Sequence, residues 1–286
     1  MTTTRALTLG HSPDPDDAFM FYALARGLID TYGWSFQHVL QDIQTLNERA
    51  TRGELDITAI SMHAYPLVAD KYALTTCGSS MGDGYGPLVV AAEPCTIEQL
   101  RNKTILVPGE MTTAFLILNL LLGRGAFKHR VVMFDRILDG VARGEADAGL
   151  IIHEGQLTYQ SRKLHNVVDL GRWWQQETSL PLPLGGNCIR RSLGTDAMAQ
   201  VTGILRDSIA YSLAHRSQAI RYALQFARDM DEKLADRFVG MYVNDWTMDY
   251  GERGRQAVHE LLRRAFEIGM VPAVERIDFV APADHL

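Results

Sequence analysis

Short apolar runs alternate with amphipathic segments along most of the chain. Apolar runs of about four to eight residues predict buried strands, whereas apolar positions that recur every three or four residues predict helices. Strands are predicted at residues 5–10, 34–41, 57–62, 88–92, 104–108, 131–134, 148–152, 167–170 and 187–191. Helices are predicted at residues 16–26, 43–52, 112–122, 135–143 and 173–178, with a short one starting at His63. This alternation is typical of an α/β protein whose helices cover parallel sheets.

The pattern changes after residue 195, because from there to residue 270 the apolar positions keep a helical period without any strand. A helical run that has no sheet of its own must pack on one already built. The glycine-rich residues 82–87 look like a crossing between two lobes. We therefore expect residues 1–87 and 191–286 to form one lobe and residues 88–190 the other. A ligand cleft is expected between them.

Composition narrows the class of protein. The chain has 286 residues and a net charge of −6, without a basic tract of five residues, so we expect no nucleic-acid partner.

The longest apolar run, residues 114–122, contains Asn119 and is too short for a bilayer; it predicts a buried helix and no membrane insertion. The N-terminal residues lack the pattern of a secretory signal, and three widely spaced cysteines fit neither a zinc site nor a disulfide framework. A cytoplasmic protein that binds a small molecule is expected.

His153 and Glu154 follow the predicted strand at residues 148–152. Ligand crevices of open α/β sheets lie at the carboxyl ends of strands, and an imidazole there titrates near neutral pH. His153 is therefore a candidate base, although position alone equally allows a histidine that only closes the strand. Glu154 is a poor candidate to orient the ring, because neighbouring strand residues point to opposite faces.

Residues 12–17, Ser-Pro-Asp-Pro-Asp-Asp, follow the first predicted strand. Three carboxylates suit a metal ion, but the structural interpretation is favoured: the prolines fix a turn, and Asp16 or Asp17 caps the next helix. Ser12 can face a ligand under either interpretation.

Ser61 ends another predicted strand. There it either donates a hydrogen bond to a ligand or caps the short helix that starts at His63. His63 is expected on the surface of that helix. Gly109 permits a tight turn before Thr112 and Thr113. The threonine hydroxyls and the free amides of the helix start form an anion site, unless a threonine merely caps the helix. No phosphate-binding glycine motif occurs, so nucleotide cofactors are not indicated.

Five blocks, taken together and in order, resemble the 1,4-dihydroxy-6-naphthoate synthases of the futalosine route to menaquinone. The blocks are residues 10–19, 42–47, 107–114, 149–154 and 168–185. They span nearly the whole chain, and their joint occurrence is the specific signal.

This resemblance implies the two-lobed fold of type 2 periplasmic binding proteins, used as an enzyme. The implied activity is that of a carbon–carbon lyase, which converts cyclic dehypoxanthinyl futalosine to 1,4-dihydroxy-6-naphthoate and dihydroxyacetone without metal or organic cofactor. His153 matches the general base of the family. The substrate-binding positions that the resemblance implies are Ala59, Ile60, Ser61, Thr113 and Ala114.

The chain departs from the family members compared with it at three positions. Asp14 and Asp16 stand where those members have Cys and Asn, and Ala59 replaces a common lysine. Losing that cation either weakens the binding of a carboxylate-bearing substrate or accompanies a slightly different substrate, while backbone donors at Ile60 and Ser61 would remain.

Two other functions fit the same fold. One is a non-catalytic small-molecule binding protein, a class that is usually exported. The other is the sibling enzyme chorismate dehydratase, against which the Leu-Ile-Ile-His-Glu block argues.

Overall fold

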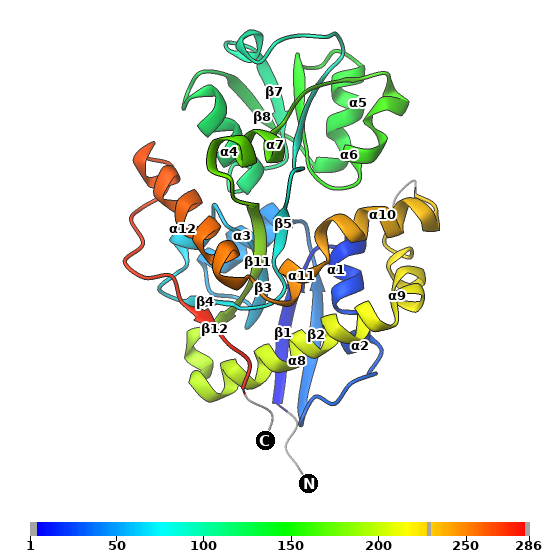
Figure 1. The fold of residues 1–286 in the computed structure, drawn as a ribbon, viewed down its shortest axis with the longest axis vertical. Coiled ribbons are helices and arrows are strands. Elements are labelled where there is room, and N and C mark those ends of the chain that lie inside the picture. Colours follow the sequence, from blue (N-terminus) through cyan, green and yellow to red (C-terminus); the bar gives the residue numbers. More distant parts are fainter. Residues whose placement is uncertain (1–4, 228–229, 284–286) are drawn as a thin grey trace.

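The computed structural model describes residues 5–227 and 230–283, which form two lobes, each with its own sheet (Figure 1). The larger sheet has the order β12-β4-β11-β3-β1-β2, with β5 paired to β11. Its strands are β1 (Arg5–His11), β2 (Trp34–Leu40), β3 (Ile57–Ser61), β4 (Tyr72–Thr75), β5 (Ser80–Gly82), β11 (Leu182–Arg190) and β12 (Phe279–Val280). The smaller sheet has the order β10-β6-β9-β7-β8. Its strands are β6 (Leu88–Ala91), β7 (Thr104–Val107), β8 (Lys128–Val131), β9 (Ala148–Ile151) and β10 (His165–Asp169).

Helices surround both sheets (Figure 1). The lobe of the larger sheet carries α1 (Pro15–Met20), α2 (Tyr22–Ala25), α3 (Ile43–Thr51), α8 (Thr195–Ala214), α9 (Arg216–Ala223), α10 (Glu232–Tyr242), α11 (Asp245–Met248) and α12 (Gly251–Glu267). The other lobe carries α4 (Thr113–Leu122), α5 (Ile137–Ala142), α6 (Gly155–Thr158) and α7 (Leu170–Thr178). Within the described residues, no helix is both long enough and apolar enough to cross a membrane.

The sheets are mixed, so the expectation of parallel sheets was right only in part. Strands β2, β1 and β3 run parallel, as do β8, β7 and β9. In contrast, β11 is antiparallel to β3 and β4, and β6 is antiparallel to β9 and β10. The strand predicted at residues 131–134 lies three residues earlier, as β8. Every residue of β8 is exposed at the sheet edge, so the strand lacks the apolar pattern that marks buried strands.

The longest strand of the larger sheet, β11, is the least visible in the sequence. Two prolines and two glycines interrupt residues 181–186, and the pairing of β11 with β5 shifts register between Pro183 and Gly185. Only its second half was predicted as a strand. The division of the chain at residues 87 and 190 stays a prediction, and the pairing of β11 favours a second boundary near residue 181.

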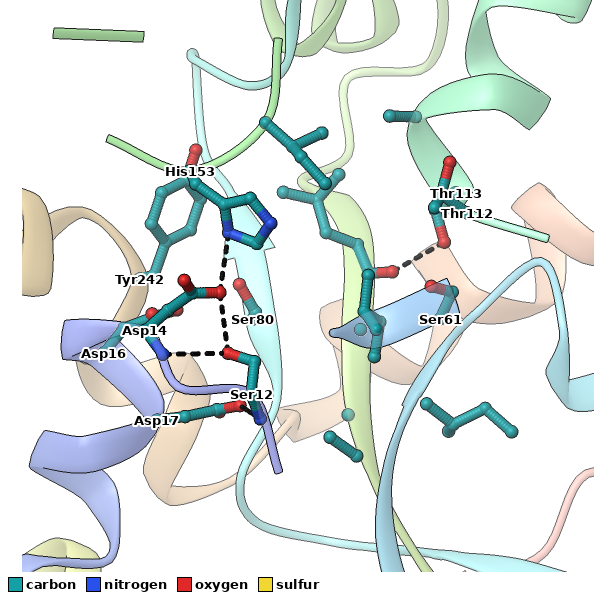
Figure 2. A pocket seen from close by; sticks show the side chains of 18 of the residues that line it. Ser12, Asp14, Asp16, Asp17, Ser61, Ser80, Thr112, Thr113, His153 and Tyr242 are labelled. Atoms are coloured by element: carbon teal, nitrogen blue, oxygen red, sulfur yellow. Dashed lines mark hydrogen bonds and ion pairs between the residues drawn. The ribbon is translucent and has the colours of Figure 1, made fainter. Parts of the chain in front are cut away.

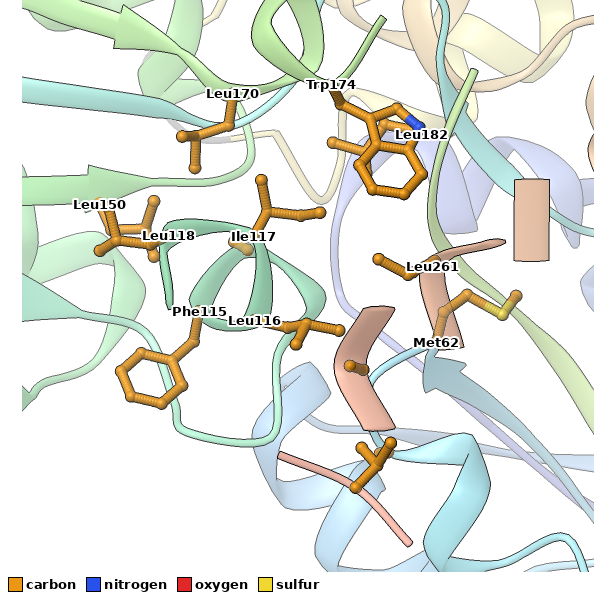
Figure 3. Packing of buried hydrophobic residues seen from close by; sticks show 14 of the residues in the cluster. Met62, Phe115, Leu116, Ile117, Leu118, Leu150, Leu170, Trp174, Leu182 and Leu261 are labelled. Carbon is orange, nitrogen blue, oxygen red and sulfur yellow. The ribbon is translucent and has the colours of Figure 1, made fainter. Parts of the chain in front are cut away.

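Apolar packing joins the two lobes in addition to the chain crossings. In Figure 3, Leu116 and Ile117 of α4 lie on one side of a cluster that includes Trp174 of α7 and Leu261 of α12. Trp174 is fully buried, and its indole N–H donates to the carbonyl of Pro181 at 3.0 Å. A separate apolar cluster packs α8, α9 and α10 against the larger sheet, which is where the strand-free C-terminal run was expected to pack.

Candidate active site

A cavity lies between the two lobes (Figure 2). Its empty space amounts to about 790 Å³ when the part that is open to solvent is included. The larger-sheet lobe contributes residues that follow β1 and end β3. The smaller-sheet lobe contributes the start of α4 and the residues after β9. Every candidate site residue lines this cavity: Ser12, Ala59, Ile60, Ser61, Thr113, Ala114 and His153. The structure brings them together, and their roles stay predictions.

His153 contacts a carboxylate from the opposite lobe. Its Nδ1 lies 2.8 Å from Oδ2 of Asp14, and both side chains are largely buried. The hydroxyl of Ser12 donates to the same Asp14 oxygen at 2.7 Å. The other ring nitrogen, Nε2, is buried and has no hydrogen-bond partner among the residues that the structure describes. In Figure 2 the ring reaches from its loop into the cavity, with one nitrogen on Asp14. The partner of the imidazole is therefore Asp14, a residue assigned from the sequence to a turn.

The backbone of His153 has φ of +66°, the left-handed region that non-glycine residues rarely occupy. Such a conformation costs about 1–3 kcal/mol and persists where the surrounding structure holds it. The ring of Phe134 packs against the imidazole with 4.3 Å between centroids. Two contacts, one polar and one aromatic, thus fix the orientation of His153.

Asp16 and Asp17 complete an acidic cluster beside this pair. Burial raises the pKa of Asp17 to about 6, and the charge of Asp14 adds to this, while the amide of Ser12, which donates to Asp17 at 2.6 Å, opposes it. Burial and the neighbouring carboxylates raise the pKa of Asp16 well above its usual value. Burial alone would lower the pKa of His153, but Asp14, Glu154 and Asp16 outweigh it and raise the pKa to about 9. His153 therefore keeps its proton at neutral pH.

The prediction that Asp16 or Asp17 caps the next helix was wrong. Asp14 occupies the N-cap of α1, and no side chain makes a capping hydrogen bond there. Asp17 accepts from the Ser12 amide instead, so it closes the turn rather than the helix. Across residues 5–227 and 230–283, no group of His, Cys, Asp and Glu is arranged to hold a metal ion.

Ser61 and Asn47 form a second polar centre. The Asn47 amide donates to the Ser61 hydroxyl at 3.0 Å, and the Ser61 backbone N–H donates to the Asn47 side chain at 2.9 Å. The expectation of a free backbone donor at Ser61 was therefore wrong, because Asn47 takes that hydrogen. Ser61 also caps no helix. The bond from Asn47 leaves the Ser61 hydroxyl hydrogen able to donate to a ligand.

The two threonines at the start of α4 have different roles. Thr112 caps the helix by accepting from the amide of Phe115 at 3.2 Å. The hydroxyl of Thr113 donates to the carbonyl of Leu184 at 2.6 Å and accepts from the amide of His63 at 3.2 Å, which joins the two lobes. The amides of Thr113 and Ala114 belong to the first helical turn, where the helix supplies no acceptor, so they suit an anionic or hydroxyl ligand.

His63 lies in the interior and not on the surface, contrary to the prediction. Its Nδ1 donates to the carbonyl of Thr112 at 3.2 Å, and burial lowers its pKa. The expected role of Gly109 as a turn residue was also incomplete. A Cβ at this position would stand 2.2 Å from Oε1 of Gln44, which accepts from the amide of Met111 at 3.0 Å. Glycine is needed at 109 because the side chain of Gln44 approaches the backbone there.

Sequence reasoning missed other residues of the cavity. The hydroxyl of Tyr242 in α10 donates to Gln156 in α6 at 2.8 Å, a further buried bond between the lobes. Neither residue belongs to a pattern that marks a site. Asn47 did lie in a block of the family resemblance, and a buried asparagine on an amphipathic helix is the signal that could have identified it. Among the described residues, the lining contains no lysine or arginine.

His11, the last residue of β1, does not line the cavity. Its Nδ1 donates to the Ser12 carbonyl at 3.0 Å, and its Nε2 lies 2.9 Å from Nδ1 of His38. Burial and the neighbouring His38 lower the pKa of His11 to about 3. Both ring nitrogens are thus engaged in the interior of the lobe.

Two lobes with mixed sheets and a cleft between them define a periplasmic-binding-protein-like fold. Within that fold class, the chain belongs to the menaquinone biosynthesis family, whose model matches residues 7–267. It is 41% identical over 275 residues to the 1,4-dihydroxy-6-naphtoate synthase of Thermus thermophilus, with 96% of this chain and 99% of the relative covered. It is 39% identical over 272 residues to the 1,4-dihydroxy-6-naphtoate synthase of Streptomyces coelicolor, with coverage of 94% and 95%.

Two solved structures share this fold. A protein from Archaeoglobus fulgidus superposes with a TM-score of 0.89 at 44% identity, covering 93% of this chain and 98% of that one. The alkanesulfonate-binding protein of Xanthomonas axonopodis pv. citri superposes with a TM-score of 0.69 at 12% identity, covering 94% of each chain. At that identity the second likeness concerns the fold alone.

Proposed function

We propose that this chain is a carbon–carbon lyase of menaquinone biosynthesis that acts in the cytoplasm. It converts cyclic dehypoxanthinyl futalosine to 1,4-dihydroxy-6-naphthoate and dihydroxyacetone. The names of the two relatives support this reaction. The observation that carries the proposal is the state of His153: its Nε2 is buried in the cleft without a partner in the described part of the chain, while its Nδ1 is fixed on a carboxylate.

In this reaction Nε2 of His153 accepts a hydroxyl proton of the substrate as the carbon–carbon bond breaks. The bicyclic product gains aromaticity, which supplies the driving force, so a base and a shaped cavity suffice. General-base assistance is typically worth about 10²–10⁴-fold in rate. Only the neutral ring accepts a proton. Because the pKa of His153 is raised to about 9, roughly one ring in a hundred is neutral at pH 7.

The polarity of the cavity favours one orientation of the substrate. The acidic cluster with His153 lies at one end, and Ser61 lies with Thr113 at the other (Figure 2). A substrate carboxylate is placed away from the acidic end, because the hydroxyl and the helix-start amides that can donate to it lie at the other end. It lies instead against the Ser61 hydroxyl and the first amides of α4, with Ala59 and Ile60 beside it. The carbon chain to be cleaved then faces His153. Ser12 contributes chiefly by holding Asp14.

The test is incubation of the purified protein with cyclic dehypoxanthinyl futalosine, with products followed by mass spectrometry. Wild type should release 1,4-dihydroxy-6-naphthoate and dihydroxyacetone. His153→Ala should lose about 10²–10⁴-fold in rate. The matched control is His165→Ala, on the exposed edge strand β10, which should keep wild-type turnover. Substrate binding without turnover by wild type would identify a non-catalytic binding protein, and full activity of His153→Ala would remove His153 as the base.

A further inference from the structure

We propose that Asp14 is a positioning residue that makes His153 a base through Nε2, so that the reactive imidazole is one half of a pair assembled from both lobes. The inference rests on the proposed function and adds the residue that sets the tautomer and orientation of its base. The observation behind it is the 2.8 Å contact between Oδ2 of Asp14 and Nδ1 of His153.

The first step concerns the tautomer. An ionised carboxylate only accepts hydrogen bonds, so the nitrogen that faces it must carry a hydrogen. A neutral His153 held by Asp14 is therefore protonated on Nδ1, and its lone pair lies on Nε2. That nitrogen is buried at the cavity and has no partner within residues 5–227 and 230–283. Without Asp14, either tautomer is accessible, and the ring loses one of its two fixed contacts.

The second step concerns the carboxylate, which is held for this contact from its own lobe. The hydroxyl of Ser12 donates to Oδ2 at 2.7 Å, and the Asp14 amide lies 3.3 Å from the same hydroxyl oxygen (Figure 2). Pro15 opens α1 immediately afterwards and fixes the backbone. Asp14 is 4% exposed, so solvent does not screen the pair. Oδ2 of Asp14 therefore contacts both the Ser12 hydroxyl and the imidazole of His153. The contact with Ser12 keeps the carboxylate oriented toward the ring.

The third step concerns the other groups around the imidazole. Asp16 and Asp17 approach from the same segment as Asp14, and Glu154 is the chain neighbour of His153. From the remaining side come Phe134, which packs on the ring, and Tyr242, whose hydroxyl is engaged by Gln156. Of the acidic groups, Asp14 has the largest influence on His153, and it is the one bonded to the ring. Substituting Asp14 therefore tests the pair, while the weaker charges stay in place.

The experiment uses the full chain as wild type, Asp14→Asn, His153→Ala and the double variant. Histidine ring nitrogens are followed by NMR from pH 5 to 10, and the resonance missing from His153→Ala identifies residue 153. In wild type the ring should titrate near pH 9 and carry its hydrogen on Nδ1 when neutral. In Asp14→Asn the midpoint should fall to about the ordinary 6.5 or lower, because burial then acts without the opposing charge.

Kinetics on the same four proteins separate a positioning role from a structural one. Above about pH 9, where the wild-type ring is also neutral, Asp14→Asn should lower kcat about 10- to 10³-fold while KM changes by less than about threefold, because the loss falls on general-base assistance. At pH 7 the larger neutral fraction of the ring in Asp14→Asn offsets part of this loss. In the His153→Ala background the same substitution should have almost no further effect, since Asp14 acts through the ring. Equal losses in both backgrounds, or an unchanged His153 titration in Asp14→Asn, would overturn the proposal.

A second variant covers the case in which Asp14→Asn does not fold. Ser12→Ala keeps the carboxylate and removes the hydroxyl that holds it, so the midpoint of His153 should move less than in Asp14→Asn, with a partial loss of kcat. No change in either quantity contradicts the proposal. If wild type shows the expected titration but forms no product, the proposed function fails and the pair stands. If wild type forms product but His153 titrates as an isolated ring, the pair fails and the function stands.

Discussion

Asp14 and His153 stand on opposite lobes, and the 2.8 Å between Oδ2 of Asp14 and Nδ1 of His153 spans the cleft. Asp14 belongs to the turn after β1, and His153 to the turn after β9. The two residues are therefore positioned by different sheets. The distance between Asp14 and His153 depends on how the two lobes are placed relative to each other.

The rate should rise with pH. His153 accepts a proton only when neutral, and its pKa is raised to about 9, so kcat/KM should increase roughly tenfold per pH unit below that value and level off above it. Initial rates from pH 6 to 10 measure this. The His165→Ala control should give the same profile. A rate that is flat or falling between pH 7 and 9 contradicts the assignment of His153.

Stability should fall as the pH rises. The folded pKa of His153 lies above its ordinary 6.5, so its contribution is fully present below about pH 6.5 and is lost as the pH passes through about 9. The raised pKa of Asp17 acts in the same direction between about 4 and 6. The His153 contribution is up to about 3 kcal/mol. Urea unfolding at pH 6.5 and 9.5 should show the decrease in wild type and a much smaller one in His153→Ala.

Ser61→Ala should weaken substrate binding. A hydrogen bond from its hydroxyl contributes about 0.5–1.5 kcal/mol to a neutral group and about 1.5–3 kcal/mol to a carboxylate. The larger effect is expected, because the orientation proposed above puts the carboxylate at this end. Calorimetry with 1,4-dihydroxy-6-naphthoate measures the dissociation constant, and Ser161→Ala on the exposed surface is the matched control. Unchanged affinity would remove the Ser61 hydroxyl from the binding site.

Thr113→Val should affect stability as well as binding. The valine keeps the shape of the side chain but leaves the Leu184 carbonyl and the His63 amide without their shared partner. A buried polar group that loses its partner costs about 1–3 kcal/mol. Thermal unfolding measures this loss, and calorimetry at a temperature where the variant is folded measures the loss of affinity. A variant as stable as wild type shows that these two groups find other partners.

Residues of the cavity could be predicted from the sequence where their position in a strand or helix is enough to indicate a binding role. Ser61 and His153 were recognised because polar residues at the carboxyl ends of buried strands meet at one edge of a sheet. Thr113 was recognised because a helix start offers free amides. Each inference needed only a few neighbouring residues, and the structure places all three on one cavity.

The contacts between the lobes could not be predicted in this way. Asp14 has the spacing of a capping residue, and nothing near it in sequence indicates a distant imidazole. Tyr242 and Gln156 meet for the same reason, through packing of α10 against the other lobe. Strand β11 was only half recognised because its prolines and glycines are read as turn residues, although the neighbouring strands β3 and β4 hold it in the sheet.

Because the bond from His153 reaches the far lobe, any separation of the lobes would be coupled to proton binding by the ring. Separating the lobes would take the ring away from Asp14 and return its affinity for protons toward that of an ordinary histidine. The closed form would then hold a proton that the open form gives up, and by reciprocity acid would favour closure. Each cycle of opening and closing between about pH 6.5 and 9 would exchange hydrogen ions with the solvent.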